Sequence, residues 1–138
     1  MEVFQKAQGI MTKNNFIIAT PKSKVSDVAL AIISGEVSGI PVIDGNKKVV
    51  GVVTEFDIIR AIKKGMNIKD ITTEEIMTKN PITVNEDTNI NDIIDILETR
   101  HFIRVPVVDK NGKLVGIVSR RDILKGVTEF DGAPQIWL

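Results

Sequence analysis

The chain of 138 residues has no cysteine, no tyrosine, a single histidine and no net charge. Without cysteine it has no disulfide framework, no thiol nucleophile and no thiolate ligand for a metal. Its 18 basic residues balance its 18 acidic ones and only 4% of residues are aromatic, so nothing general attracts nucleic acid or an anionic membrane. No apolar run reaches the roughly 18 residues of a membrane span, and Glu2 and Lys6 are not typical of a signal peptide. We therefore expect a soluble, cytoplasmic protein.

The sequence does contain the same unit twice. The tetrapeptide Ile-Met-Thr-Lys at residues 10–13 returns at residues 76–79. Residues 41–58 and 106–123 share 10 identities in 18 positions, where unrelated sequences would share about one. Each copy has only about 60 residues, a length at which a single core is marginal. We therefore expect the copies to share a core, and any site at their seam to occur in two related versions.

Both copies carry the same order of predicted elements, which is strand, helix, strand, strand, helix. Apolar residues at helical spacing predict a helix that carries Val25, Val28, Ala29, Ile32 and Ile33 in the first copy. In the second copy they predict a helix after Thr88 or Asn89, either of which could cap it. Pro106 indicates that its strand is short or lies at a sheet edge. The other predicted segments are extended ones at 17–19 and 81–84, strands at 40–43, 49–53, 103–109 and 114–118, turns at 44–47 and 110–113, and helices that begin at Glu55 and after Ser119.

These elements predict an α+β fold of two tandem βαββα repeats that form one pseudo-twofold module. The first repeat is placed at residues 8–64, a linker at 65–74, the second repeat at 75–127 and a C-terminal tail at 128–138. Trp137 in this tail either packs on its own domain or on a partner subunit, or is mobile. Met11 and Met77 in the two tetrapeptides are interpreted as core-filling residues.

A Ser/Thr-x-x-Asp motif stands in each copy where an apolar strand turns into a helix. The motifs are Thr54 with Asp57 and Ser119 with Asp122. In one interpretation, each is a capping box that only stabilises the helix start. In the other, the helix start and the hydroxyl bind a phosphate, and the carboxylate accepts from the hydroxyls of a ribose. The recurrence of the motif in both repeats favours the second interpretation.

The chain resembles a tandem pair of CBS domains, also called a Bateman module, over roughly residues 8–127. The two Ile-Met-Thr-Lys openings, the stretches 39–44 and 104–109, and the two G-[VI]-V-[TS]-x-x-D-I stretches carry this resemblance. It implies a pseudo-symmetric pair of repeats that often dimerises into a disc. It also implies a regulatory role. In this role the module would bind AMP, ADP, ATP or S-adenosylmethionine in clefts between the repeats.

The resemblance implies one cleft for each motif. In cleft one, Thr54 and Asp57 would act with Arg104 at the phosphate and with Thr83 and Val84 beside the base. In cleft two, Ser119 and Asp122 would act with Ser38-Gly39 and with Ile18, Ala19 and Thr20 beside the base. Arg120 and Arg121 add positive charge at the second helix start, where the first copy has Glu55 and Phe56. Our hypothesis is that cleft two prefers a charged adenine nucleotide and that cleft one is weaker or takes a less charged ligand.

The leading interpretation is a regulatory module with no catalytic or metal site, no required cofactor, and an adenine nucleotide (AMP, ADP or ATP) as its ligand. The alternatives are a sensor of an S-adenosylmethionine-type ligand and a ligand-free structural or dimerisation module. An enzyme is disfavoured because His101 is isolated and the sequence has no glycine-rich phosphate loop. The resemblance also implies a homodimer and a target protein that the sequence does not identify.

Overall fold

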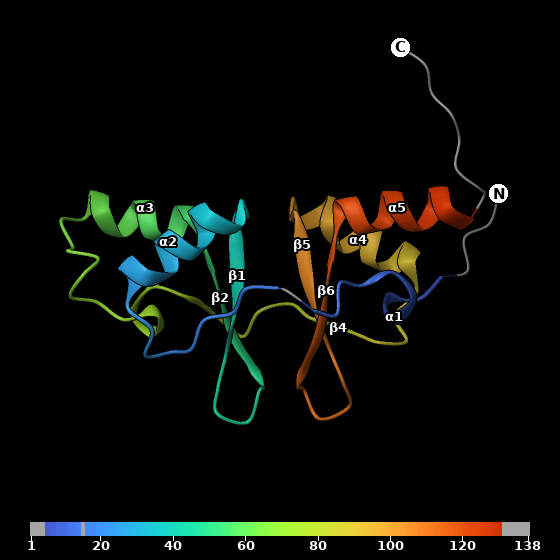
Figure 1. Cartoon of the computed structure of the whole chain (residues 1–138), viewed down its shortest axis with the longest axis horizontal. Helices are drawn as coiled ribbons and strands as arrows, with labels where there is room; N and C mark the ends of the chain where they lie inside the picture. Colours follow the sequence, from blue (N-terminus) through green and yellow to red (C-terminus); the bar gives the residue numbers. More distant parts are fainter. Residues whose placement is uncertain (1–4, 15, 131–138) are drawn as a thin grey trace, which may run out of the picture. The chain divides into compact units, whose positions relative to one another are not determined.

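The computed structural model describes residues 5–14 and 16–130, and their contacts divide the chain into two compact units (Figure 1). The first-repeat unit comprises residues 17–82 and 111–114. The second-repeat unit comprises the described residues among 1–16, 83–110 and 115–138. Each unit combines most of one repeat with the segment that opens the other repeat. This added segment enlarges a core that about 60 residues would leave marginal.

The first-repeat unit packs two helices on a small antiparallel sheet. Its sheet has the order β1-β2-β3, and the partly extended segment before α2 joins β1 through a parallel bridge between Ala19 and Val42. The core gathers Val25, Val28 and Ile32 of α2 with strand residues such as Val42 and Val53. The elements are α2 (Val25–Gly35), β1 (Gly39–Ile43), β2 (Val49–Thr54), α3 (Glu55–Lys63), the short 3-10 helix η1 (Thr73–Glu75) and β3 (Thr78–Lys79).

The second-repeat unit follows the same plan. Its sheet has the order β4-β5-β6, with β4 parallel to β5. Asn89 caps α4 by accepting a hydrogen bond from the backbone N–H of Asn91 at 2.8 Å, which confirms one of the two predicted caps. The elements are α1 (Ala7–Ile10), β4 (Val84–Asn85), α4 (Ile90–Arg100), β5 (Arg104–Val108), β6 (Leu114–Ser119) and α5 (Arg120–Phe130).

The predicted helices and the strands of each hairpin are confirmed, but two details differ. The extended segments that were predicted to begin each repeat shrink to the single bridge at Ala19 and to the two residues of β4. The prediction that Pro106 lies in a short strand is confirmed, and the alternative of a sheet edge is wrong because β5 is the middle strand. This position tolerates proline because β4 pairs only with Val107 and Val108, beyond the missing N–H of Pro106.

Backbone bonds at the tip of the second hairpin explain why residues 111–114 belong to the first-repeat unit. The N–H of Leu114 donates to the carbonyl of Lys47 at 2.9 Å, and the N–H of Val49 donates to the carbonyl of Gly112 at 3.3 Å. The first hairpin turns at Asp44, whose Oδ1 accepts from the N–H groups of Asn46 and Lys48. Aspartate is favoured at this position because its side chain accepts hydrogen bonds from the backbone of its own turn.

The two Ile-Met-Thr-Lys segments each pack on the glycine of a hairpin strand. Met77 lies over Gly51 of β2, where an added Cβ would meet its sulfur at 2.5 Å. Met11 lies over Gly116 of β6, where an added Cβ would meet its sulfur at 2.6 Å. Each repeat thus receives the methionine of the other repeat's opening, and the interpretation of both methionines as packing residues is confirmed. The absence of a side chain at these two repeated glycines leaves room for the methionines.

We expect Gly51→Ala and Gly116→Ala each to lower the free energy of unfolding by about 1–3 kcal/mol, because overpacking displaces a methionine and the nearby backbone. Urea denaturation followed by circular dichroism measures this change. Gly45→Ala is the matched control, since an added Cβ there meets nothing within 4 Å, and it should stay within about 0.5 kcal/mol of the original chain. An equal loss at Gly45 would contradict the explanation.

Among the helices of residues 5–14 and 16–130, none is both long and apolar enough to cross a bilayer.

Candidate functional site

Both Ser/Thr-x-x-Asp motifs form capping boxes, as one of their two interpretations predicted. The hydroxyl of Thr54 accepts from the N–H of Asp57 at 3.2 Å, and Asp57 Oδ2 accepts from the N–H of Thr54 at 2.9 Å. The hydroxyl of Ser119 accepts from the N–H of Asp122 at 3.1 Å, and Asp122 Oδ2 accepts from the N–H of Ser119 at 2.9 Å. Capping uses only one oxygen of each carboxylate. The capacity to bind a ligand therefore depends on what the other oxygen, Oδ1, contacts.

In the first-repeat unit, the second oxygen of the acid is occupied by a cation of the same helix. Asp57 Oδ1 accepts from Nη2 of Arg60 at 2.8 Å, and only 7% of the Asp57 side chain is exposed. A buried carboxylate that caps a helix with one oxygen and holds a guanidinium with the other is already fully bonded. A ribose could bond Asp57 only after displacing Arg60.

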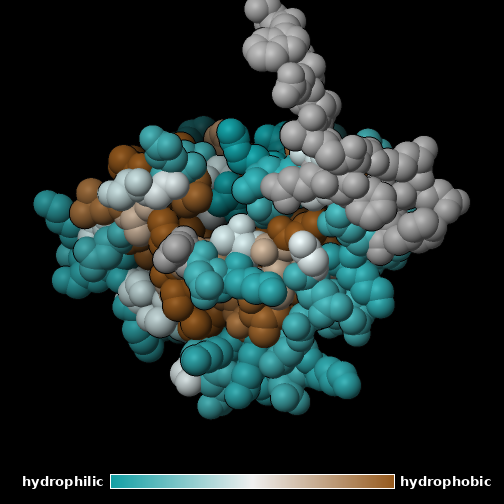
Figure 2. All heavy atoms as spheres, turned by 45° about the vertical axis from the view of Figure 1, so that its right-hand side comes forward, coloured by the Kyte–Doolittle hydropathy of each residue, from teal (hydrophilic) through white to brown (hydrophobic). Residues whose placement is uncertain are grey.

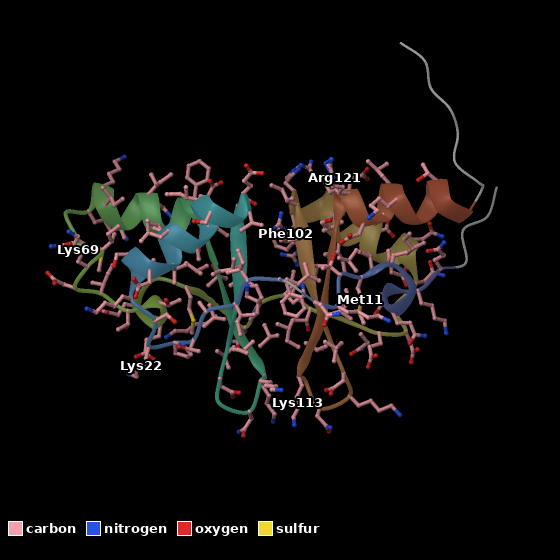
Figure 3. The ribbon with its side chains drawn as sticks, viewed as in Figure 1. Met11, Lys22, Lys69, Phe102, Lys113 and Arg121 are labelled. Carbon is pink, nitrogen blue, oxygen red and sulfur yellow. The ribbon has the colours of Figure 1, made fainter. Side chains whose placement is uncertain are left out.

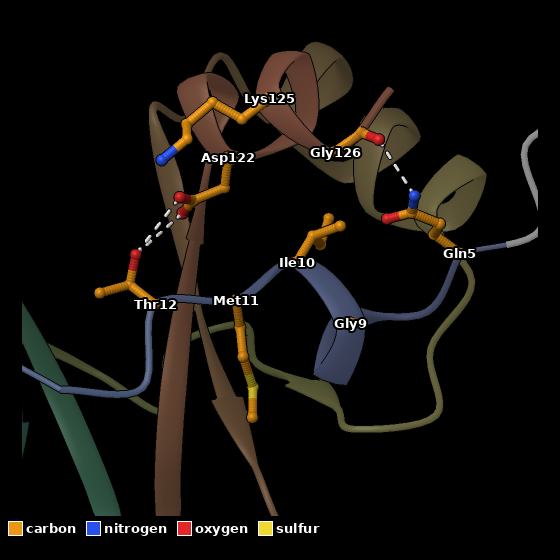
Figure 4. A pocket seen from close by; sticks show the side chains of 8 residues that line it. All are labelled: Gln5, Gly9, Ile10, Met11, Thr12, Asp122, Lys125 and Gly126. Atoms are coloured by element: carbon orange, nitrogen blue, oxygen red, sulfur yellow. Dashed lines mark hydrogen bonds between the residues drawn. The ribbon is translucent and has the colours of Figure 1, made fainter. Parts of the chain in front are cut away.

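In the second-repeat unit, the acid is more open. The hydroxyl of Thr12 donates to Asp122 Oδ1 and Oδ2 at 3.3 and 3.4 Å, which are long distances for a hydrogen bond between oxygens. Asp122 lines a pocket of about 380 Å³, a volume within the range of small-molecule sites (Figure 4). The other residues that line this pocket are Gln5, Gly9, Ile10, Met11, Thr12, Lys125 and Gly126.

Lys125 occupies the position in the second repeat that Arg60 holds in the first, three residues after the acid. It lines the pocket (Figure 4) but, within the described part of the chain, makes no ion pair with Asp122. The two acids therefore differ although their capping boxes are the same. Asp57 is neutralised within its own helix, whereas Asp122 offers an oxygen to the pocket.

Arg104 brings a half-buried cation to the same unit. Its strand starts beside the start of α5, because the N–H of Arg120 donates to the carbonyl of Ile103 at 2.9 Å. Burial of the guanidinium lowers the pKa of Arg104, and the negative charge of Asp122 opposes this shift. Among the described residues, Arg104 Nε is a buried donor without a hydrogen-bond partner. Buried donors are usually bonded, so this one could donate to an anion.

The structure groups the remaining predicted residues by unit. Thr83 and Val84, at the start of β4, belong to the unit of Arg104, Ser119 and Asp122. Arg120 and Arg121 are exposed, and Figure 3 shows Arg121 pointing outward from the start of α5. The residues that share a unit with Thr54 and Asp57 are Ile18, Ala19, Thr20, Ser38 and Gly39.

Local contacts place part of the first-repeat group beside its capping box. The N–H of Glu55 donates to the carbonyl of Ser38 at 2.8 Å, which ties the start of β1 to the start of α3. Gly39 allows this approach, since an added Cβ would lie 3.1 Å from the carbonyl oxygen of Val53. The predicted clefts combine residues of both units, so these combinations remain predictions.

Sequence reasoning missed Thr12, Arg60 and Lys125. The two cations carry a signal that could have been used, because each follows the acid of its motif by three residues and therefore shares its helix face. Thr12 carries no such signal, since it stands 110 positions from Asp122. His101 is the exposed C-cap residue of α4, and among the described residues no three His, Asp or Glu side chains gather as metal ligands would.

The family model for the CBS domain matches residues 7–64 and 69–129. The chain belongs to the CBS-domain family. This family assignment confirms the resemblance, and the two matched stretches agree with two tandem repeats in one chain.

Solved structures of other CBS pairs are similar to this chain over most of its length. CBSX2 from Arabidopsis thaliana, crystallised in complex with AMP, is 30% identical with a TM-score of 0.80, over 92% of this chain and 98% of that one. The CBS pair of protein MJ0100, crystallised with 5′-methylthioadenosine and S-adenosyl-L-methionine, is 28% identical with a TM-score of 0.78, over 94% of this chain and 100% of that one. Both similarities confirm the α+β fold of tandem CBS repeats.

Curated relatives are longer than the matched region. An uncharacterized protein of Methanopyrus kandleri, MK0525, is 28% identical over 118 residues, which are 85% of this chain and 60% of the relative. The chain spans 60% of MK0525, 74% of a 17.7 kDa protein of Acidianus ambivalens and 24% of a homoserine O-acetyltransferase of Methanococcus vannielii. The matched part is thus a CBS pair that other proteins carry together with further sequence.

Proposed function

We propose that this CBS pair is a regulatory module that senses an adenosine-containing ligand, with AMP as the best fit, and that it catalyses no reaction itself. One observation carries the proposal: Asp122 lines a pocket with an oxygen that is only weakly bonded, in the unit where Arg104 has a buried donor without a partner. The complexes of CBSX2 with AMP and of MJ0100 with adenosine derivatives support a ligand of this class.

Each group has a chemical role in the proposal. Asp122 accepts from the ribose hydroxyls, as acids do beside phosphate-binding helix starts. The hydroxyl of Ser119 and the positive end of the α5 dipole face the phosphate, and Arg104 pairs with it through its fork of donors. Arg120 and Arg121 add positive charge at this helix start, and Thr83 and Val84 remain predicted contacts of a base.

The first-repeat unit is proposed as the weaker site. Thr54 and Asp57 repeat the motif, with Ser38-Gly39 beside them, but Arg60 occupies the acid. Displacing this ion pair costs part of the binding free energy of any ribose there. This reason agrees with the ranking that the sequence predicted from Arg120 and Arg121. The segment Ile18-Ala19-Thr20 remains a predicted contact of a base.

A sensor of S-adenosylmethionine or 5′-methylthioadenosine is the second candidate, because MJ0100 was crystallised with both. The half-buried guanidinium of Arg104 argues against the sulfonium ligand, since two cations held close to each other repel. The same cation favours the phosphate of AMP. A ligand-free structural module is the third candidate, and the weakly bonded oxygen of Asp122 argues against it.

Isothermal titration with AMP, ATP and S-adenosylmethionine in parallel tests the proposal, after a check for co-purified nucleotide. We expect AMP to bind in the micromolar range and S-adenosylmethionine to bind more weakly. Tighter binding of S-adenosylmethionine would contradict the role of Arg104. If verified apo protein binds none of the three, both Ser/Thr-x-x-Asp motifs are helix caps only and the proposed function is wrong.

We also propose that the module acts on a target protein, forms a homodimer and works in the cytoplasm. Binding alone produces no output, so a ligand at this site must favour one of two arrangements that a target distinguishes.

A further inference from the structure

The basic residue three positions after each motif acid makes a different contact in the two repeats. Arg60 and Lys125 stand 65 residues apart, the offset of the repeat, so they hold the same place on their helices. Both lie on the helix face of the acid. Arg60 pairs with Asp57 at 2.8 Å, whereas among the described side chains Lys125 has no ion-pair partner. The second repeat therefore keeps a positive charge that the first repeat has already used.

The side chain of Lys125 points toward the start of α5. Side chains on a helix lean back toward its N-terminus, so each residue covers the turn before its own. Figure 4 shows the Lys125 side chain extending in the same direction as the carboxylate of Asp122, with the hydroxyl of Thr12 below them. All three residues line the pocket. Lys125 thus brings an ammonium group to the part of the pocket where the acid lies.

The chemistry of the two cations explains their different contacts. A guanidinium is a planar and weakly hydrated fork of donors that matches a carboxylate, so Arg60 loses little hydration by pairing with its own acid. An ammonium group is compact and strongly hydrated, and Lys125 is exposed. Figure 2 turns the side of α5 forward and shows mostly hydrophilic residues there beside the grey atoms. Lys125 therefore stays in water, with its charge available to an anion.

From these observations we infer that Lys125 is a further binding residue of the site at Asp122, where its ammonium group pairs with the phosphate of the nucleotide. The inference rests on the proposed function, in which the ribose bonds Asp122 and the phosphate lies at the start of α5. This start is the turn that the Lys125 side chain covers. Arg104 belongs to the same unit, so the phosphate meets one fork of donors and one point charge.

The same position also decides which repeat binds the nucleotide. An arginine there bonds the acid and withholds both the carboxylate and its own charge from a ligand, as Arg60 does. A lysine there leaves the carboxylate open and gives its charge to the phosphate. Exchanging the two residue types should therefore close the site of the second-repeat unit and open one in the first-repeat unit.

Titration of Lys125→Met and Lys125→Arg with AMP and with adenosine tests the inference. We expect Lys125→Met to bind AMP about 5- to 20-fold more weakly, because a charge-assisted contact is lost from a site open to water, and adenosine within about twofold of the original chain. Lys125→Arg keeps the positive charge, yet it should weaken both ligands about tenfold, because the guanidinium bonds Asp122 in the way that Arg60 bonds its own acid. Lys110→Arg, an exposed lysine of the second hairpin turn, is the control and should change neither affinity.

The reciprocal variant Arg60→Lys tests the same position in the first repeat. We expect its titration with AMP to show two binding events per chain in the micromolar range, where the original chain shows one. Thermal melting without ligand gives a readout that needs no nucleotide. Arg60→Lys should lower the melting temperature by a few degrees, since the ion pair with Asp57 is lost, whereas Lys125→Met should leave it unchanged.

The outcomes separate this inference from the proposed function. If the original chain binds no AMP, the proposed function is wrong and the inference fails with it. If the original chain binds AMP but Lys125→Met binds it equally well, or loses AMP and adenosine alike, only the role of Lys125 at the phosphate is overturned. A single binding event in Arg60→Lys, together with unchanged binding by Lys125→Arg, overturns the choice of repeat by this position.

Discussion

Replacing Asp122 by asparagine is expected to weaken AMP binding by about 10- to 100-fold. A hydrogen bond from a ligand hydroxyl to a carboxylate contributes about 1.5–3 kcal/mol, and each 1.4 kcal/mol is tenfold in affinity. Asparagine keeps the size of the side chain and an oxygen for the helix cap, so the loss comes from the negative charge that faces the pocket. Isothermal titration with AMP, at the same protein concentration for each variant, measures the change.

Asp57→Asn is the matched control. It should leave AMP binding nearly unchanged and should instead lower the stability of the fold. We expect a change in AMP affinity of less than about threefold, because Arg60 already occupies Asp57 Oδ1. Its free energy of unfolding should fall by about 1–2 kcal/mol, since the ion pair joins a buried acid to a largely exposed arginine. If Asp57→Asn abolished binding while Asp122→Asn left it unchanged, the assignment of the stronger site to the second-repeat unit would be wrong.

The elements of the fold were predictable because local rules determine them. Helical spacing of apolar residues predicted α2 and α4, and the polar residues before the first apolar position predicted a cap at Thr88 or Asn89, of which Asn89 caps the helix. The turn at Asp44 follows from the ability of its side chain to bond the next N–H groups. Each of these signals depends on residues only a few positions apart, so the sequence of one repeat was enough to predict its helices and turns.

The exchange of segments between the repeats was not predictable in the same way. Gly51 and Gly116 were visible as part of a repeated stretch, but their reason is a methionine from the opening of the other repeat. Met77 follows Gly51 by 26 positions and Met11 precedes Gly116 by 105. No local pattern indicates such a contact. The composition of the two compact units depends on these distant pairs.

The candidate site shows the same limit. The Ser/Thr-x-x-Asp motifs could be found and both of their interpretations stated, because the capping box is a local arrangement. Whether each acid has an oxygen available for a ligand depends on a second side chain that bonds the carboxylate. Arg60 reaches Asp57 along one helix face, which periodicity could have revealed, whereas Thr12 reaches Asp122 from the other end of the chain. That Arg104 and Asp122 lie in one compact unit likewise depends on contacts between distant segments, and the cleft in which Arg104 would act with Asp57 stays a prediction.

Replacing Arg104 by methionine is expected to remove the preference for a phosphate. AMP should bind about 10- to 100-fold more weakly, because a charge-assisted pair with the phosphate is lost, whereas the affinity for adenosine should change less than about threefold. Parallel titrations of the variant and the original chain with both ligands give the AMP-to-adenosine ratio. This ratio separates a lost phosphate contact from a general disturbance, which would weaken both ligands alike.

The stability of the Arg104→Met variant further distinguishes a lost phosphate contact from a general disturbance of the site. Methionine fills a similar volume and removes a cation whose pKa burial lowers, so the free energy of unfolding should stay the same or rise. Arg121→Met is the control for charge alone: its side chain is exposed and points outward from α5 (Figure 3), and AMP affinity should change less than about threefold. If Arg121→Met weakened AMP as much as Arg104→Met, the positive potential of the helix start, rather than the buried donor of Arg104, would be what holds the phosphate.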